Sequence, residues 1–312
     1  MTLILLGHEI SRTDAHSSLR YEKARPMGLF AVADSALTRK DGLEDGRASY
    51  RTLLTGLEKV HELNIKVLRP DILRNGRFQS YLSTPAYEGR AFLAFAGNAN
   101  SAHHVLNAVR NNLNSLVVSY RFDFQKGEPK RFIMINGRDE NPMRDQGVAF
   151  DEETFFEADV ELLFTAENFS RVVAQAIESA LQSVVTHCQS EKDVRLANAT
   201  FAFGVWCPVS KVHSLYHFQP QREMEFGQLR LVAKPRAVSE GEVLALGTQR
   251  VIDELPIQKV YEAALAEEKS PAEALHALMD RDIDQEHAAF TGYPINRPLF
   301  RVFLKENNLK RL

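Results

Sequence analysis

Cysteine is scarce in this chain of 312 residues, which has two, Cys188 and Cys207. So few thiols exclude the disulfide framework of a small secreted domain and favour a reducing, cytoplasmic setting. Long apolar runs are also missing. The N-terminal run from Leu3 to Leu6 is too short for a signal peptide, and no stretch reaches the ~20 apolar residues of a membrane-spanning helix. We therefore expect a cytoplasmic protein with no membrane partner.

A strong charge of one sign is absent as well. Lys and Arg number 38 against 41 Asp and Glu, which gives a net charge of -3. This balance offers no electrostatic basis for binding nucleic acid. No Gly-x-x-x-x-Gly-Lys-Ser/Thr phosphate loop occurs, so any ATPase would be a separate protein.

Histidines at metal-binding spacing are also lacking. His103 and His104 are adjacent on an expected helix and point in different directions. His213 and His217 share the face of an expected strand, but no cysteine or carboxylate accompanies them at zinc spacing. We expect no metal and no cofactor.

The segments that are present alternate between short apolar runs and amphipathic stretches. No repeat, low-complexity tract or linker divides the chain, so we expect one domain over residues 1–312. Runs of strands separated by helix pairs favour two stacked sheets with helices on both outer faces. Expected strands cover residues 2–7, 28–38, 65–68, 92–96, 116–124, 131–135, 199–206, 213–218, 228–232, 242–247 and 301–304. Expected helices lie within residues 41–63, 100–113, 164–187, 257–269 and 271–285, the first because its leucines recur at helical spacing.

Six segments resemble those of the proteasome β-type family, including the HslV-type peptidases, and follow the family's order. Met1-Thr2 opens directly into a strand, and VADSALT at 32–38 resembles the family's Gly/Ala-Asp-x-x-x-Thr turn. NIKV at 64–67 resembles the strand that carries the family's buried lysine. The other three segments are AFAGNANSAHHVLNAV at 94–109, VLALGTQ at 243–249 and FTGYPI at 290–295. The resemblance implies an α+β fold, a four-layer αββα sandwich of two antiparallel sheets. This N-terminal nucleophile hydrolase type would carry insertions near residues 9–27, 41–62 and 114–163.

The implied chemistry is that of a threonine-type peptidase. Removal of Met1 would leave Thr2 with a free α-amine, whose reference pKa of about 7.7–8.0 suits a general base for its own hydroxyl. By resemblance, Lys66 would lie beside the Thr2 hydroxyl and lower its pKa. Asp34 would pair with Lys66 and keep it charged and oriented.

Further site residues also come from the resemblance. The backbone N–H of Gly97 would stabilise the oxyanion, and Thr248 takes the place of a supporting serine. The backbone at Thr38 would bind the substrate as an added strand. The family's second supporting aspartate has no counterpart, because its register falls on Ala288, with Asp284 and Glu286 nearby. Thr291 replaces a turn serine.

The expected partners follow from the same resemblance. They are a peptide or unfolded-protein substrate, further copies of the chain in a homo-oligomeric ring, and a separate ATPase unfoldase. Two other functions stay open on the same fold. One is a scaffold or binding subunit without catalytic activity, which the missing aspartate and the insertions favour. The other is a small-molecule amidase whose insertions narrow the site.

Overall fold

The computed structural model describes residues 2–10, 26–44, 47–123, 128–137, 140–145, 150, 152–188, 190, 199–225, 228–289 and 295–312. One of its two large sheets has five strands in the order β14-β1-β2-β15-β16, and every pairing is antiparallel. These strands are β1 (Leu3–Ile10), β2 (Pro26–Asp34), β14 (Leu244–Gly247), β15 (Leu299–Lys305) and β16 (Asn308–Arg311).

The second large sheet has seven strands in the order β13-β10-β9-β6-β5-β7-β8. They are β5 (Val60–Ile72), β6 (Phe78–Gly97), β7 (Leu116–Asp123), β8 (Glu128–Ile135), β9 (Ala199–Cys207), β10 (Val212–Phe218) and β13 (Pro235–Val238). The prediction of purely antiparallel sheets was wrong at one place, because β5 and β7 pair in parallel. Helix α1 lies between β6 and β7, and parallel neighbours require such a crossover.

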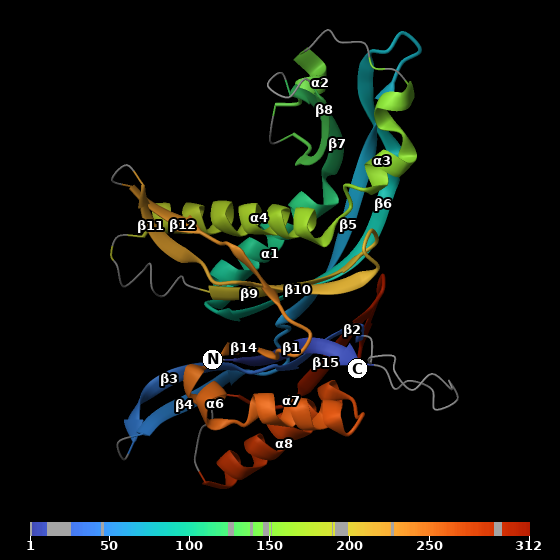
Figure 1. Ribbon diagram of the computed structural model, residues 1–312. Coiled ribbons are helices and arrows are strands. Elements are labelled where there is room, and N and C mark those ends of the chain that lie inside the picture. Colours follow the sequence, from blue (N-terminus) through green and yellow to red (C-terminus); the bar gives the residue numbers. More distant parts are fainter. Residues whose placement is uncertain are drawn as a thin grey trace, which may run out of the picture.

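Helices lie on the outer faces of both large sheets (Figure 1). Over the seven-stranded sheet lie α1 (Ala99–Asn114) and α4 (Ala166–Thr186), and below the five-stranded sheet lie α7 (Ile257–Ala266) and α8 (Pro271–Ala289). Asn98 begins α1 by accepting a hydrogen bond from the N–H of Ser101, and Thr165 does the same for α4. No helix within the described ranges is long and apolar enough to cross a membrane.

Period-two alternation in β1 and β2 explains how the layers pack. Leu3 and Leu5 belong to an apolar cluster that includes Tyr261 and Leu275 of the helices below, whereas Ile4 belongs to a second cluster together with residues of the other sheet. Successive side chains of a strand point to opposite faces, so one strand contributes to both clusters. A third cluster packs α1 and α4 against the seven-stranded sheet.

A β-hairpin replaces the helix predicted within residues 41–63. Strands β3 (Leu37–Glu44) and β4 (Arg47–Leu54) form a separate two-stranded sheet. Leu53 and Leu54 leave about half of their surface exposed, at 51% and 46%. They therefore do not mark the buried stripe of a helix, and their helical spacing was misleading.

The remaining elements are small. A second hairpin consists of β11 (Gln221–Glu225) and β12 (Gln228–Val232). Beyond β8 come α2 (Pro142–Asp145), the 3-10 helix η1 (Glu152–Phe155) and α3 (Glu157–Glu161), and α6 (Gln249–Glu254) follows β14. In Figure 1, α2 and α3 lie with β7, β8 and the far ends of β5 and β6, away from the stacked sheets. Most described residues of the range 114–163, where an insertion is predicted, belong to these elements.

Candidate active site

Thr2 stands at the start of β1, where the neighbouring strand fixes its backbone. Leu3 pairs with Gly247 of β14, so Thr2 lies beside Thr248, the residue that begins α6. The N–H of Thr248 donates to the Thr2 carbonyl oxygen at 2.9 Å. Gly247 has φ +138°, and a Cβ there would lie 1.8 Å from the same oxygen. Only glycine fits this close approach, which brings Thr248 into contact with Thr2.

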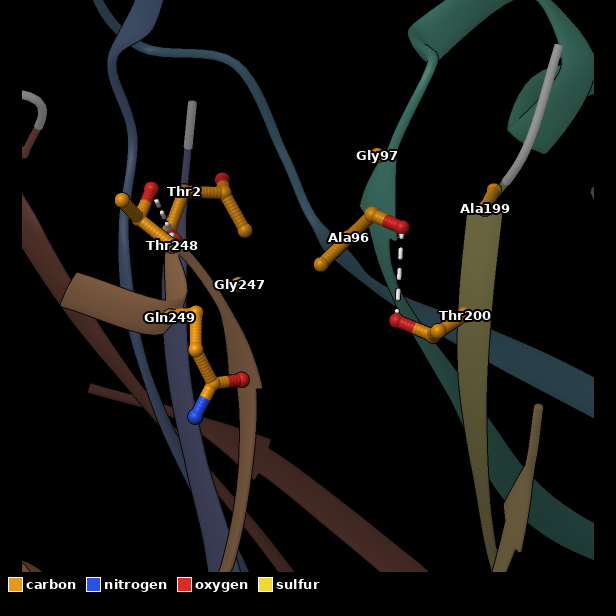
Figure 2. Close-up of a pocket in the computed structure, with 8 residues that line it drawn as sticks. All are labelled: Thr2, Ala96, Gly97, Ala199, Thr200, Gly247, Thr248 and Gln249. Carbon is orange, nitrogen blue, oxygen red and sulfur yellow. Dashed lines mark hydrogen bonds between the residues drawn. The ribbon is translucent and has the colours of Figure 1, made fainter. Parts of the chain in front are cut away.

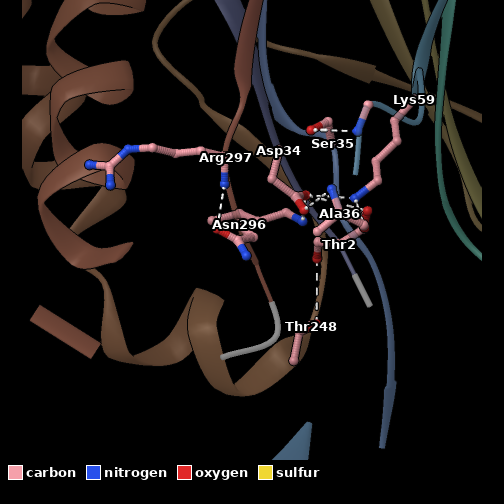
Figure 3. Close-up of polar contacts among 10 residues, drawn as sticks. Thr2, Asp34, Ser35, Ala36, Lys59, Thr248, Asn296 and Arg297 are labelled. Carbon is pink, nitrogen blue, oxygen red and sulfur yellow. Dashed lines mark hydrogen bonds and ion pairs between the residues drawn. The ribbon is translucent and has the colours of Figure 1, made fainter. Parts of the chain in front are cut away.

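The carboxylate of Asp34 is the point on which the site converges (Figure 3). Its Oδ1 accepts from the ammonium of Lys59 and from the N–H of Leu3, both at 2.8 Å. The hydroxyl of Thr2 lies 3.4 Å from the same oxygen. The N–H of Ala36 donates to Oδ2 at 3.1 Å. Asp34 is fully buried, and Thr2 and Lys59 expose 6% and 4% of their surface.

Lys59 is held from several sides. Its Nζ also donates to the carbonyl of Ala36 at 2.7 Å. Its own carbonyl accepts from the N–H of Phe95, two residues before the end of β6, at 3.0 Å. Just upstream, the N–H of Leu57 donates to the carbonyl of Ser35 at 2.9 Å. The turn after β2 and the start of β5 are thereby tied together.

Lys59, and not Lys66, is therefore the lysine paired with Asp34, and the sequence-based assignment was wrong. Both lysines precede a valine, so each fits the Lys-Val pattern. Lys66 lies within β5 on the same side as the exposed Glu62 and Asn64, and its register partner is Glu88 of β6. Lys66 is thus partly exposed and lies beside a carboxylate other than that of Asp34.

Burial and charge act against each other in the Asp34–Lys59 pair. Burial lowers the pKa of Lys59, while attraction to Asp34 acts to raise it. Burial likewise raises the pKa of Asp34, against the opposing effect of Lys59 and of the N–H groups of Leu3 and Ala36. Neither ion is stable here without its partner, because an isolated buried charge is costly. A lysine whose pKa is lowered also releases a proton more readily than one in water.

A cleft of about 360 Å³ opens beside Thr2. Figure 2 shows its two walls, one from the start of β1 and the end of β14, the other from β6 and β9. Gly97 stands in the wall opposite Thr2, with φ +121°, a conformation that favours glycine. No charged side chain occurs among the described residues that line it, which are Thr2, Ala96, Gly97, Ala199, Thr200, Gly247, Thr248 and Gln249.

Neither Thr38 nor Asp284 is among the described residues that line this cleft. Thr38 is buried in β3 and pairs in register with Thr52. Asp284 and Asp280 each bond the guanidinium of Arg297 at 2.7 Å. The side chain of Ala288, the side chain of Glu286 and all of Thr291 fall outside the described residues. Within the described ranges no group of three potential ligands could hold a metal ion, and both cysteines are free.

His61 follows the Lys59-Val60 step and is packed among aromatic rings. Its ring stacks on Phe95 at 5.3 Å and meets His103 edge-on at 5.6 Å. Burial, followed by the nearby His103, lowers the pKa of His61 to about 4, although Glu58 opposes the shift. His61, two residues after Lys59, is therefore neutral at physiological pH.

Acidification is expected to destabilise the fold through His61. The unfolded chain binds this proton near pH 6.5 and the folded chain near pH 4, so the free energy of unfolding falls as pH drops through that window. His61→Phe keeps a stacking ring but cannot bind the proton. Between pH 7 and 5 its free energy of unfolding should therefore fall by roughly 1 kcal/mol less than that of the unaltered protein. Denaturant titrations at several pH values measure it. The exposed His104, changed to Phe, is the control, and equal pH slopes in all three proteins would contradict the assignment.

Comparison with known proteins gives little beyond this geometry. No family model and no curated protein matches the chain. Among solved structures, the chain is similar to Anbu (ancestral beta-subunit) from Yersinia bercovieri, with a TM-score of 0.42 and 11% sequence identity. The likeness covers 99% of this chain and 86% of that one. Function is therefore inferred from the site itself.

Proposed function

We propose that this protein is an N-terminal nucleophile hydrolase, a threonine-type peptidase whose nucleophile, Thr2, is exposed by removal of Met1. One observation carries the proposal. The Thr2 hydroxyl and the buried Lys59 ammonium converge on the same oxygen of Asp34, beside a cleft. We further propose that the two sheets and their helices form one αββα domain over residues 1–312.

In the proposed mechanism each group near Asp34 has a role. With Met1 removed, the α-amine of Thr2 takes the proton of its own hydroxyl, and Oγ attacks the substrate carbonyl carbon. The Lys59 ammonium lowers the pKa of that hydroxyl and stabilises negative charge, while Asp34 keeps the ammonium charged and in place. Because amine and hydroxyl belong to one residue, their relative position is nearly fixed before the substrate binds.

The second half of the reaction releases both products and restores the free Thr2. The C–N bond breaks when the leaving amine takes the proton from the α-ammonium, which leaves an ester between Thr2 and the acyl group. Water, deprotonated by the α-amine, then hydrolyses the ester. We propose the N–H of Gly97 as donor to the oxyanion, since Gly97 faces Thr2 across the cleft (Figure 2).

Substrate and partners follow from the resemblance in the sequence. A peptide would add as a strand beside the backbone at Thr38 in β3. Assembly into a homo-oligomeric ring in the cytoplasm, fed by a separate ATPase unfoldase, is part of the same proposal. No cofactor enters the chemistry, because amine, hydroxyl and lysine suffice for acyl transfer.

A scaffold without catalytic activity is the second candidate, and one contact favours it. Asp280 and Asp284 bind Arg297, so these two carboxylates are engaged away from Thr2. A small-molecule amidase would use the same chemistry as the peptidase, and turnover of peptides against small amides separates the two.

The mass of the intact protein, with and without an electrophile directed at N-terminal threonine, tests the proposal. Loss of Met1 together with one stoichiometric adduct is the expected result, since a free amine and an activated hydroxyl are both needed. Retained Met1 without an adduct would contradict it and favour the scaffold.

A further inference from the structure

The C-terminal hairpin reaches both halves of the Asp34–Lys59 pair. Strand β15 begins beside Asp34, because Leu299 pairs with it in register. Strand β16 then folds back along β15, where Arg311 pairs with Val302. The last residue is held too, since the N–H of Leu312 donates to the carbonyl of Arg301 at 2.8 Å. The hairpin that lines one side of Asp34 thus presents Arg311 at a fixed place.

Arg311 contacts the residues on either side of Lys59. One guanidinium nitrogen binds the carboxylate of Glu58, and the other donates to the carbonyl of Val60 at 3.0 Å. The guanidinium carbon lies 6.0 Å from the ring centroid of Phe300. A planar fork with two donors fixes direction as well as distance, which a single ammonium does not.

The contacts of Arg311 and the Asp34–Lys59 ion pair both connect one large sheet to the other. Asp34 ends β2 of the five-stranded sheet, and Lys59 directly precedes β5 of the seven-stranded sheet. Arg311 of β16 makes the same crossing next to it, onto Glu58 and Val60. On its other side, Lys59 is bound through its carbonyl to Phe95 of β6. Arg311 and Phe95 therefore hold the lysine backbone from two directions.

We propose that Arg311 is a positioning residue, which holds residues 58–60 in the place from which the Lys59 ammonium reaches Asp34 and Thr2. The inference rests on the proposed function for its catalytic meaning, though not for its geometry. A 2.8 Å contact between buried ions tolerates little displacement of the backbone. Release of Glu58 and Val60 lets this segment move and admits water to the ammonium.

Arg311→Met tests the proposal, since it keeps a long apolar side chain over Phe300 and removes both donors. The first readout is the rate at which acetic anhydride acylates Lys59 in the folded full-length protein, followed by peptide mass spectrometry. We expect about a tenfold increase over the unaltered protein, as local opening exposes the amine. Lys310→Met, the exposed neighbour on β16, is the matched control and should leave the rate unchanged.

The second readout is the pH profile of adduct formation at Thr2. If Arg311 positions the lysine, Arg311→Met slows adduct formation about tenfold and shifts the profile, whereas Arg311→Lys restores part of the rate. A merely structural role would lower thermal stability without moving the profile. Glu58→Gln weakens the same contact from the opposite side, and it decides the question if Arg311→Met does not fold.

Different measurements would show failure of this inference and failure of the proposed function. Acylation of Lys59 requires no chemistry at Thr2. An unaltered protein that forms no adduct would overturn the peptidase, while the Lys59 rates would still decide the role of Arg311. Equal Lys59 acylation in the unaltered protein, Arg311→Met and Glu58→Gln would overturn that role.

Discussion

Thr2→Ala is expected to reduce peptide hydrolysis by roughly a thousandfold or more, because the proposed mechanism takes the attacking oxygen from the Thr2 hydroxyl. The hydroxyl lies 3.4 Å from Asp34 Oδ1, so its loss removes one long contact and leaves the pair with Lys59 in place. The fold should therefore survive. Hydrolysis of fluorogenic peptides by the purified variant, with its unfolding temperature recorded beside it, measures both effects.

Two companion variants of Thr2→Ala separate chemistry from packing. Thr2→Ser keeps an amine and a hydroxyl at the same place and should retain measurable turnover. Thr186→Ala removes a threonine from the exposed last turn of α4 and should change nothing. If Thr2→Ala kept a tenth of the activity while folded, the nucleophile would have to be sought elsewhere.

Lys59→Met should also abolish turnover, whereas Lys66→Met should leave it within about twofold. Lys59 forms an ion pair with Asp34 at 2.8 Å, whereas Lys66 is partly exposed in β5 and pairs in register with Glu88. Removal of Lys59 leaves a fully buried carboxylate without its cation, at a cost of about 3–5 kcal/mol of stability. Denaturant titration and peptide turnover together measure the two losses.

The double variant Lys59→Met/Asp34→Asn separates stability from chemistry. An uncharged amide in place of the carboxylate should restore much of the stability, because no isolated charge remains buried. Turnover should not return, because the positive charge near the Thr2 hydroxyl is still missing. Activity in this protein, or its loss in Lys66→Met, would refute the assignment of Lys59.

The sequence predicted helices and strands best where the spacing of buried apolar residues along one segment identifies the element. The amphipathic stretches at 100–113 and 164–187 are confirmed as α1 and α4, and the apolar run at 92–96 lies within β6. The hairpin β3–β4 was missed because Leu53 and Leu54 imitate a helical stripe although half their surface faces solvent. The parallel pairing of β5 and β7 depends on contacts far apart in sequence, which no local pattern reveals.

The residues of the candidate site could likewise be predicted only in part from the sequence. Thr2, Asp34 and Thr248 were named from the resemblance to the proteasome β-type family, and the structure brings these three residues together. Lys66 was chosen over Lys59 as the partner of Asp34, which was wrong, although the sequence itself contains evidence against Lys66. Leu63, Ile65 and Val67 alternate with polar residues, which assigns Lys66 to the polar side. The neighbours that bury Lys59, namely Asp34 and Ala36, become visible only in three dimensions.

The Asp34–Lys59 bond has a mechanical consequence. Asp34 ends β2 of the five-stranded sheet, whereas Lys59 precedes β5 of the seven-stranded sheet, and the 2.8 Å contact between them spans the seam between the two sheets. A slide of one sheet over the other by the length of a bond would part the two charges while every strand kept its partners. If the proposed mechanism holds, catalysis would therefore depend on the relative position of the two sheets and would fail under a distortion too small to register as unfolding.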